Sequence, residues 1–460
     1  MKQFADRPPV YESDGGTAFD LHLASAILKV HGHIALSMSF RDHAERATVV
    51  DVETSVNHGF MEESNRTRHI PLIFTNIPEA PGHRAIMNIL TRAQLCEHWG
   101  LTPGELIDTL GWAMENPIEP LLVTKEEAEC FQNTMITPDL SVIPIPWHYP
   151  EDRGRYMSAS VIVAERGPDR NMSYHRQFLS GPNRLVARLV PRHLRQLTDE
   201  ARADQEELRV AIINGADPCV LLCAAMSFDE RKDELSVAAA LHQKLYGKPL
   251  RVVEVSNGVL VPADCEYVFT AKITNQDDEE GPYVDITGTV DDIRMQPVIH
   301  VESVHHRDDP IFHAILPAAK EHKTLMGLPR APTIKAAVSK VTNCTDVHLS
   351  EGGCGWLSSV VAITPSSEED AQMAIQAALD GHRSMKSVTV VDDDIRIDDP
   401  VHVEWAMMTR WQPDRDTTIL SSQKGSSLDP SRSEDGTTSK VGFDATIPYG
   451  EDREPYSAVN

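Results

Sequence analysis

Apolar residues recur at helical spacing in some parts of the chain and form short β-branched runs in others. In residues 1–115 these two kinds of segment alternate. The expected elements are a helix at 19–30, strands at 34–38, 47–52 and 70–74, and helices at 88–99 and 103–114. Thr102 is the expected N-cap of the last helix, with Pro103 at its first position. The alternation predicts a small α/β domain, preceded by a disordered segment at 1–15.

The stretch from 118 to 300 has a different pattern, in which short β-rich runs dominate. The expected strands are 120–123, 141–145, 157–164, 185–190, 209–213, 250–255 and 267–273, with helices at 191–202 and 233–246. Many short strands with turn residues between them predict a closed or split β-barrel.

Helical spacing returns near residue 309. The expected elements are a connecting helix at 309–327, strands at 334–341, 358–363 and 387–391, and a helix at 368–380 capped by Ser366 and Ser367. The final forty residues are polar and are expected to form a lid or tail over another element.

The fold class that follows is α/β and multi-domain. It comprises an N-terminal α/β domain at 1–115, a central split β-barrel domain at 116–308, a linker helix at 309–327 and a C-terminal α/β domain at 328–460.

Composition narrows the class of protein. A length of 460 residues fits about three domains. A formal net charge of -26 argues against a nucleic-acid or anionic-membrane partner, but local arginines can still bind a small anion. The first residues lack the apolar core of a signal peptide, and no run approaches the ~18 apolar residues of a membrane span. Seven cysteines without a CxxC pair predict neither a disulfide framework nor a thiolate zinc site, so we expect a cytoplasmic protein.

The segment Glu280-Gly281-Pro282-Tyr283-Val284-Asp285 carries two carboxylates across a Gly-Pro turn, and a strand is expected at 286–290. Two carboxylates at the mouth of a strand can share a pocket in which one is an acid and the other a base or an orienting group. The alternative is a solvated hairpin tip, because residues 277–280 are four consecutive acids.

Three other residues have side chains suited to a divalent cation. Asn171 offers an amide oxygen, His193 begins an expected helix and Glu234 begins another. Each also has a plainer interpretation, as a turn cap, a packed histidine and a first-turn acid. Arg176 follows Asn171 closely and is either a carboxylate- or phosphate-binding group or a surface charge. Spacing alone does not bring these groups together.

In this order the segments resemble the UbiD family of reversible decarboxylases, which use prenylated FMN. The resemblance covers roughly 150–430 and rests on ordered matches: Asn171 to Arg176, 191–195, Glu234, 260–264, 280–285, 306–311, 391–395, 405–415 and 425–430. That many matches in one order favour the shared pocket over the solvated tip.

The resemblance implies a role for each matched residue. Asn171, His193 and Glu234 would hold Mn²⁺ or Mg²⁺ against the cofactor phosphate, with K⁺ nearby. Arg176, Glu280 and Asp285 would form the catalytic set, and Leu428 would lie near the substrate. The implied cofactor contacts are Ser158, Asn171, Tyr174, His175, Arg176, Arg192, His193, Ala225, Met226 and Glu234.

The implied activity is non-oxidative, reversible decarboxylation of an aromatic, heteroaromatic or α,β-unsaturated carboxylic acid through a covalent adduct with prenylated FMN. Arg176 would bind the carboxylate, Glu280 would hold Arg176, and Asp285 would protonate the carbon that loses CO₂. The alternatives are a carboxylase working in reverse and a flavin-binding subunit without decarboxylase activity. The implied partners are a flavin prenyltransferase as cofactor supplier and further copies of the chain, in a homodimer or larger homo-oligomer.

Two positions depart from the family pattern. Asp285 stands where the family has Glu, which shortens the proton donor by one methylene group, and Val284 stands where it has Gly. We expect Val284 to stiffen the turn at its most permissive position. A lysine that contacts the cofactor phosphate in some relatives has no assigned counterpart.

Overall fold

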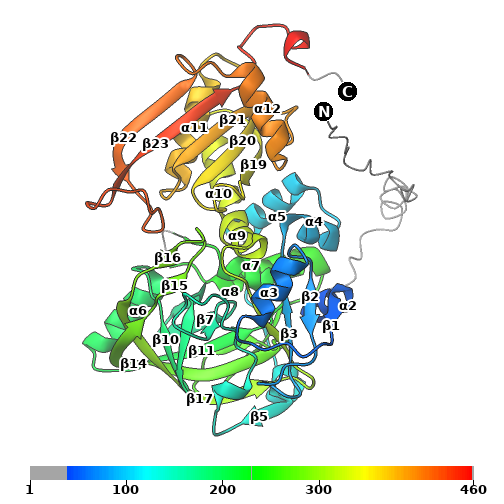
Figure 1. Ribbon diagram of the computed structural model, residues 1–460, viewed down its shortest axis with the longest axis vertical. Coiled ribbons are helices and arrows are strands. Elements are labelled where there is room, and N and C mark those ends of the chain that lie inside the picture. Colours follow the sequence, from blue (N-terminus) through cyan, green and yellow to red (C-terminus); the bar gives the residue numbers. More distant parts are fainter. Residues whose placement is uncertain (1–38, 229–230, 458–460) are drawn as a thin grey trace, which may run out of the picture. The chain divides into compact units, whose positions relative to one another are not determined.

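The computed structural model describes residues 39–228 and 231–457 of the chain (Figure 1). The expected disordered segment at 1–15, the helix at 19–30 and the strand at 34–38 lie outside these residues. Within the described ranges, no helix combines the length and apolar character that crossing a bilayer requires.

The first sheet has the strand order β1-β2-β3-β18. Its strands and neighbouring helices are α2 (Phe40–Arg46), β1 (Thr48–Val50), α3 (Gly59–Arg66), β2 (Leu72–Phe74), β3 (Arg84–Met87), α4 (Arg92–Trp99), α5 (Pro103–Glu115) and β18 (Ile311–His313). Thr102 caps α5 as expected, since its side chain accepts a hydrogen bond from the Glu105 amide.

Strand β18 lies inside the segment 309–327 that the sequence predicts to be one helix, so that prediction is wrong in its first half. All three residues of β18 are buried, and the strand pairs in parallel with β3. Pro310 and Pro317 flank the strand, and proline disfavours helix in the residue before it. The helix α9 therefore begins only at Lys320 and ends at Gly327.

Among the described residues, nine strands form one antiparallel sheet in the order β6-β9-β10-β17-β14-β11-β7-β8, with β5 paired to β17. They are β5 (Asn133–Met135), β6 (Tyr156–Met157), β7 (Val161–Arg166), β8 (Asp169–Tyr174), β9 (Gln177–Gly181), β10 (Arg184–Ala187), β11 (Leu208–Asn214), β14 (Tyr267–Glu280) and β17 (Arg294–His306). The expected strand at 141–145 is instead a 3-10 turn at Leu140–Val142, because Pro144 and Pro146 cannot donate to a ladder.

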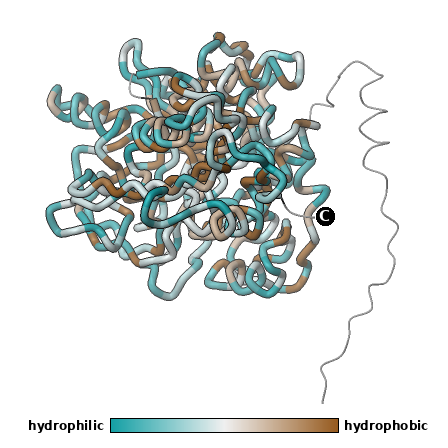
Figure 2. The backbone as a smooth tube through the Cα atoms, turned by 90° about the horizontal axis from the view of Figure 1, so that it is seen from above, coloured by the Kyte–Doolittle hydropathy of each residue, from teal (hydrophilic) through white to brown (hydrophobic). Residues whose placement is uncertain are grey.

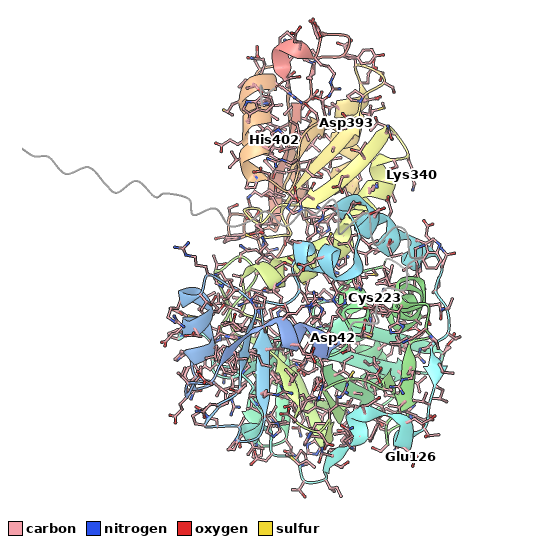
Figure 3. All side chains as sticks on the ribbon, turned by 90° about the vertical axis from the view of Figure 1, so that its right-hand side faces the viewer. Asp42, Glu126, Cys223, Lys340, Asp393 and His402 are labelled. Carbon is pink, nitrogen blue, oxygen red and sulfur yellow. The ribbon has the colours of Figure 1, made fainter. Side chains whose placement is uncertain are left out.

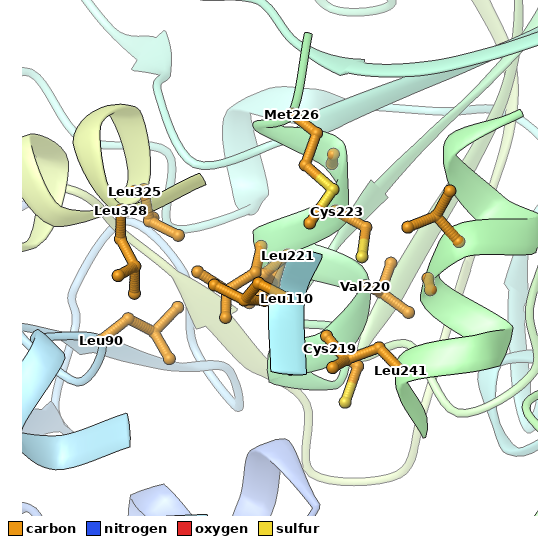
Figure 4. Packing of buried hydrophobic residues seen from close by; sticks show 14 of the residues in the cluster. Leu90, Leu110, Cys219, Val220, Leu221, Cys223, Met226, Leu241, Leu325 and Leu328 are labelled. Atoms are coloured by element: carbon orange, nitrogen blue, oxygen red, sulfur yellow. The ribbon is translucent and has the colours of Figure 1, made fainter. Parts of the chain in front are cut away.

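The helices of this region are α6 (His193–Ala203), α7 (Pro218–Ala224) and α8 (Glu234–Tyr246), and a smaller sheet contains β4 (Leu121–Leu122), β12 (Arg251–Glu254) and β13 (Leu260–Pro262). Every residue of α7 is buried, as expected for a helix that is apolar on all sides. Leu110 of α5 and Leu241 of α8 belong to the same core cluster as α7 (Figure 4). This packing fixes the segment Ala225-Met226 that follows α7.

The C-terminal sheet has the order β19-β20-β21-β23-β22. Its elements are α10 (Ala331–Val338), β19 (Asn343–Leu349), β20 (Ser358–Thr364), α11 (Asp370–Gly381), β21 (Ser387–Asp392), α12 (Pro400–Arg410), β22 (Thr417–Lys424) and β23 (Thr437–Ala445). The expected strand at 334–341 is wrong: its first half lies in α10, where Ala331, Ile334 and Val338 share one buried face.

The expected lid or tail in the final forty residues is wrong for the segment 437–445. Strand β23 lies between β21 and β22, so it is an internal strand of the sheet. Ser366 and Ser367 donate their hydroxyls to the carboxylate of Asp370 instead of capping the helix backbone.

The α/β multi-domain class is confirmed, while the domain boundaries stay predictions. Figure 2 shows hydrophobic and hydrophilic positions alternating along most segments, as expected for elements with one buried face.

Glu126, Lys340 and Asp393 are exposed, whereas Cys223 is buried (Figure 3).

Candidate active site

The guanidinium of Arg176 lies among three carboxylates. Its Nε and Nη2 donate to Glu280 at 2.8 and 2.9 Å, Nη1 donates to Asp285 at 2.6 Å, and Nη2 also donates to Asp291 at 2.9 Å. Arg176 follows β8, Glu280 ends β14, and Asp285 and Asp291 belong to a hairpin. Residues more than a hundred positions apart therefore meet at one side chain, and the expected convergence of Arg176, Glu280 and Asp285 is present.

Burial makes these ion pairs strong. The side chain of Arg176 is 7% exposed and that of Glu280 is fully buried. Burial lowers the pKa of Arg176, but the hydrogen bonds and charge of Glu280, followed by the charges of Asp285 and Asp291, outweigh burial and hold that pKa above its ordinary value. The guanidinium also lies over the ring of Tyr283, 4.7 Å from its centroid. Arg176 is thus fixed in position and permanently charged.

The turn after Glu280 needs glycine at one position. Gly281 has a φ of +92°, and a Cβ there would lie 2.8 Å from the Asp292 carbonyl oxygen. Val284 is instead an extended residue of β15 (Tyr283–Val284), which pairs with β16 (Val290–Asp291). The expected stiffening at Val284 is therefore wrong, because the permissive position is Gly281 and a β-branched residue suits a strand.

Residues 286–289 form the reverse turn of this hairpin and not the expected strand. The Asp285 amide donates to the Thr289 carbonyl, and the Ile286 amide donates to the Asp285 carboxylate at 2.6 Å. The turn brings Asp291 back beside Tyr283, on the same side as Asp285. Recognising the Gly288 turn would have revealed Asp291 as a partner of Arg176.

Further charged groups lie beside Arg176 and its carboxylate partners. Arg294 donates to Asp291 at 2.6 Å, and the Nε of Arg188 lies 3.8 Å from the same carboxylate. Burial raises the pKa of Asp291, but the hydrogen bond from Arg294 and the charge of Arg176 bring it below its ordinary value. Three arginines thus face three carboxylates. Sequence reasoning missed Arg188 and Arg294, for which no local pattern gave a signal.

Sequence reasoning also missed two more residues near Arg176 and its carboxylate partners. Asp152 accepts hydrogen bonds from the Val284 and Tyr149 amides, and burial raises its pKa to about 6 despite the charge of Arg176. His322 of α9 interacts with the charge of Asp285, which opposes the lowering of the histidine pKa by burial. The sequence gave no reason to relate either residue to Arg176.

Two of the three expected metal-binding residues touch each other. Asn171 of β8 donates its amide to the Glu234 carboxylate at 3.1 Å, and the Met172 amide donates to the same carboxylate at 2.9 Å. Glu234 is buried, and burial raises its pKa to about 8. His193 is the first residue of α6, and both α6 and α8 pack against β8. The three donors therefore come from elements that meet.

The described residues contain no group of three or more His, Cys, Asp and Glu side chains placed to hold a metal ion. The expected donor set is of another kind, because one of its three members is an asparagine. An amide oxygen, an imidazole and a buried carboxylate still form a mixed set suited to Mn²⁺ or Mg²⁺.

The remaining expected cofactor residues lie on the same elements or beside them. Tyr174 ends β8, and its buried hydroxyl has no hydrogen-bond partner among the described residues. His175 bridges Ser173 Oγ and the Arg188 carbonyl, at 3.0 Å each. Ser158 donates to the Ile315 carbonyl at 2.7 Å. Arg192 is the N-cap residue of α6, and its guanidinium donates to Ser227.

Ala225 and Met226 follow α7 and are buried. Leu428, the expected substrate neighbour, lies in the loop between β22 and β23, where its amide donates to Ser426 Oγ at 3.2 Å.

Two family models match the chain. The 3-octaprenyl-4-hydroxybenzoate carboxy-lyase Rift-related domain matches residues 122–320, and the C-terminal domain of the same carboxy-lyase matches residues 323–445. Together these matches cover more than half of the chain.

Curated relatives extend the likeness over nearly the whole chain. The anhydromevalonate phosphate decarboxylase of Methanosarcina mazei is 39% identical over 418 residues, which are 89% of this chain and 96% of the relative. The enzyme of the same name from Methanothermobacter thermautotrophicus is 43% identical over 315 residues, which are 67% of this chain and 73% of the relative.

Solved structures agree on the fold. The UbiD-class enzyme HmfF from Pelotomaculum thermopropionicum, in complex with FMN, has a TM-score of 0.87 at 30% identity and covers 92% of this chain and 97% of its own. The 3,4-dihydroxybenzoic acid decarboxylase AroY of Klebsiella pneumoniae has a TM-score of 0.82 at 23% identity, with 92% and 98% covered, which shows the fold alone.

The family models, the relatives and the arrangement around Arg176 define a carboxy-lyase. The chain belongs to the UbiD family of decarboxylases.

Proposed function

We propose that this protein removes CO₂ from anhydromevalonate phosphate, an α,β-unsaturated acid that also carries a phosphate, and that it uses prenylated FMN to do so. The observation that carries the proposal is the 39% identity to the Methanosarcina mazei enzyme over 96% of that enzyme's length. The substrate belongs to the unsaturated acids expected from the sequence, and it narrows that broad class to one compound.

The residues fit the cofactor. Tyr174 offers a buried hydroxyl without a partner among the described residues, and Ala225 and Met226 line the end of a rigid helix. The UbiD-class neighbour HmfF has been solved with FMN and, in an evolved dimeric form, with prenylated FMN. When bound, prenylated FMN supplies an electron sink for the lone pair that remains when CO₂ leaves an unsaturated carbon.

The residues also fit a divalent cation. Around Glu234, the hydrogen-bond donors are the amide of Asn171 and the Met172 backbone, which are both neutral. A buried carboxylate with neutral donors needs a cation to remain charged near neutral pH. Asn171, His193 and Glu234 would therefore hold Mn²⁺ or Mg²⁺, with K⁺ close by, and so bind the cofactor phosphate.

Arg176 binds the substrate carboxylate in the proposed mechanism. All of its hydrogen bonds in this structure go to carboxylates of the chain, so a substrate carboxylate must replace one of them. Asp285 is the one replaced, because it makes a single hydrogen bond to the guanidinium and its side chain is 18% exposed, against 0% for Glu280 and 13% for Asp291. Glu280 meanwhile keeps Arg176 in place with two parallel hydrogen bonds.

Asp285 then acts as the proton donor. Once protonated, it no longer attracts Arg176, and it can deliver its proton to the carbon that has lost CO₂. Solvent returns a proton to Asp285 after the product leaves. The shorter aspartate side chain places the acid one methylene group closer to its own backbone than glutamate would, so the substrate must approach the hairpin more closely.

The other proposed properties follow from the family. A flavin prenyltransferase supplies the cofactor, and the protein forms a homodimer or larger homo-oligomer. The chemistry is reversible, so high bicarbonate drives carboxylation of the product through the same residues. Localisation in the cytoplasm is part of the proposal.

The test uses protein that is co-produced with a flavin prenyltransferase, and it measures bound flavin and CO₂ release. We expect flavin absorbance in the purified protein and CO₂ release from anhydromevalonate phosphate, but none from 4-hydroxybenzoate or 2-furoate. In D₂O the product should carry one deuterium at the carbon that lost CO₂. The Asp285→Asn variant is the matched control, since it should keep the flavin but should not release more than about one CO₂ per bound flavin. Protein without flavin would end the cofactor proposal, and turnover of the aromatic acids alone would end the substrate proposal.

A further inference from the structure

Arg330 is a buried arginine without an acidic partner among the described residues. It ends a short 3-10 helix at Leu328–Arg330, and 9% of the residue is exposed. Its Nη1 and Nη2 reach the carbonyl oxygens of Ser227 and Ala225 at 3.4 and 3.5 Å, which are long distances for hydrogen bonds. Its Nε has no hydrogen-bond partner among the described residues. By contrast, Arg176 and Arg410, whose side chains are also largely buried, each bind carboxylates at 2.6–2.9 Å.

The surroundings of Arg330 are positive. Burial first and the charge of Arg192 second lower the pKa of Arg330 to about 9. Arg192 reaches the same segment, because its Nη1 donates to Ser227 Oγ at 2.7 Å. His382 is buried nearby, its Nε2 has no hydrogen-bond partner among the described residues, and burial and Arg330 lower its pKa to about 3. Among the described residues, no acid opposes the effect of burial and Arg192 on the pKa of Arg330.

The interactions that Arg330 makes do not compensate for its burial. Its guanidinium lies 5.3 Å from the centroid of the Trp356 ring, which is a weak attraction. This attraction is smaller than the free-energy cost of burying an ion. Among the described residues no carboxylate pairs with Arg330, which leaves the position open for an anion from outside the chain.

We propose that Arg330, together with Arg192, binds the phosphate monoester of a ligand. A phosphate dianion matches the planar fork of arginine and supplies the missing negative charge. Carboxylates of the chain already surround Arg176, so Arg330 is a second and separate anion site.

Two phosphate monoesters can reach this position. Ala225 and Ser227 flank Met226, an expected cofactor contact, which favours the phosphate of the flavin. Trp356 donates to Ser426 at 3.3 Å, and Ser426 in turn accepts from Leu428, the expected substrate neighbour, which favours the phosphate of the substrate. Binding of the substrate phosphate at Arg330 rests on the proposed function, whereas binding of the flavin phosphate does not.

The experiment compares Arg330→Gln and Arg330→Lys with Arg92→Gln. Arg92 is a matched control, because it is a largely buried arginine whose partners, Asp346 and His348 of β19, are not among the expected ligand contacts. FMN and riboflavin, which lacks the phosphate, are titrated into cofactor-free protein and followed by flavin fluorescence. Flavin-loaded protein is assayed with anhydromevalonate phosphate and with the same acid without phosphate.

If the flavin phosphate binds Arg330, Arg330→Gln weakens FMN binding about tenfold or more and leaves riboflavin binding unchanged. If the substrate phosphate binds there, FMN binding is unchanged and KM rises about tenfold for the phosphorylated acid alone. Arg330→Lys keeps the charge and recovers part of either loss. Arg92→Gln leaves every ratio between phosphorylated and phosphate-free ligands unchanged.

If Arg330→Gln weakened the binding of the phosphorylated and the phosphate-free ligand of each pair equally, Arg330 would have a structural role only. This result, or no loss of binding at all, would overturn the inference. A further measurement separates this failure from an error in the substrate. Inorganic phosphate should raise the Tm of cofactor-free wild-type protein but not that of Arg330→Gln, whatever acid the enzyme uses. An equal rise in both proteins would refute the phosphate site even if the proposed substrate is correct.

Discussion

The substitution Arg176→Lys keeps a positive charge in the site and removes the planar fork of donors. Arg176 makes four hydrogen bonds to carboxylates, two of them to Glu280. A lysine ammonium presents its donors at one point and cannot bind Glu280 through two parallel bonds. At least two charge-assisted hydrogen bonds are lost, each worth about 1.5–3 kcal/mol. Because the side chain is 7% exposed, solvent does not replace them.

The expected loss is therefore about 3 kcal/mol or more in the free energy of unfolding. If the same bonds orient the substrate carboxylate in the transition state, the rate of CO₂ release falls about 10²-fold or more. The assay measures CO₂ release per bound flavin, so a change in cofactor content does not enter the rate. Unfolding by urea, followed by circular dichroism, gives the stability of the same preparation.

Arg410→Lys is the matched control for stability. Arg410 is also fully buried and makes four hydrogen bonds, three to Asp392 and Asp394 and one to the Tyr456 carbonyl. We expect a similar loss of stability and an unchanged rate per bound flavin. If both variants lost activity in parallel with stability, Arg176 would be a structural residue and the catalytic assignment would be wrong. Full activity of Arg176→Lys would have the same meaning.

Three further substitutions test single groups of the site. Asp291→Asn removes one carboxylate from Arg176 and should lower kcat/KM about tenfold, and unchanged kinetics would show that Asp291 does not position Arg176. Glu234→Gln keeps the shape of the side chain but not its charge, so the protein should fold and lose both metal and flavin. If elemental analysis still finds the metal in this variant, the proposed donor set is wrong. Burial raises the pKa of Asp152 to about 6, above the value of about 3.9 expected in the unfolded chain. The native state therefore binds the proton more tightly, and wild-type stability falls as pH rises from about 4 through about 6. Asp152→Asn lacks this titration, so its free energy of unfolding should gain about 1 kcal/mol relative to wild type between about pH 5 and about pH 7.5, and parallel pH profiles would refute this.

Local patterns predicted most elements correctly, and the errors have physical causes. The helix cap at Thr102 and the strand at 358–363 depend on neighbouring residues, and both were found. The segment 334–341 has β-branched residues typical of a strand, but burial against α11 and β19 selected a helix with Ile334 and Val338 on one face. Strand β18 has only three residues, and its partner β3 lies more than two hundred residues earlier, so no local window contains the pairing.

The active-site carboxylates show the same limit. Glu280 and Asp285 could be selected because their motif resembles a known family, and Arg176 because it follows Asn171 at the expected spacing. Asp291 belongs to no such motif, and it reaches Arg176 only because the hairpin reverses at residues 286–289. Arg188 and Asp152 join the site through the packing of separate segments. The sequence could therefore predict that Arg176, Glu280 and Asp285 meet, but not the second set of charges that surrounds them.

The distribution of charge around the two buried arginines connects these observations. The excess of acids in the chain says nothing about where an anion binds, because charge acts locally in a buried site. Around Arg176, arginines and carboxylates balance. In the proposed mechanism a substrate carboxylate therefore enters by displacing Asp285, and this displacement releases the acid that would protonate the product. Around Arg330 no carboxylate of the described residues balances the guanidinium, so an anion can bind there without displacing a side chain. An exchangeable site suits the group that leaves as CO₂, and a permanently positive site suits a phosphate that is retained throughout the reaction.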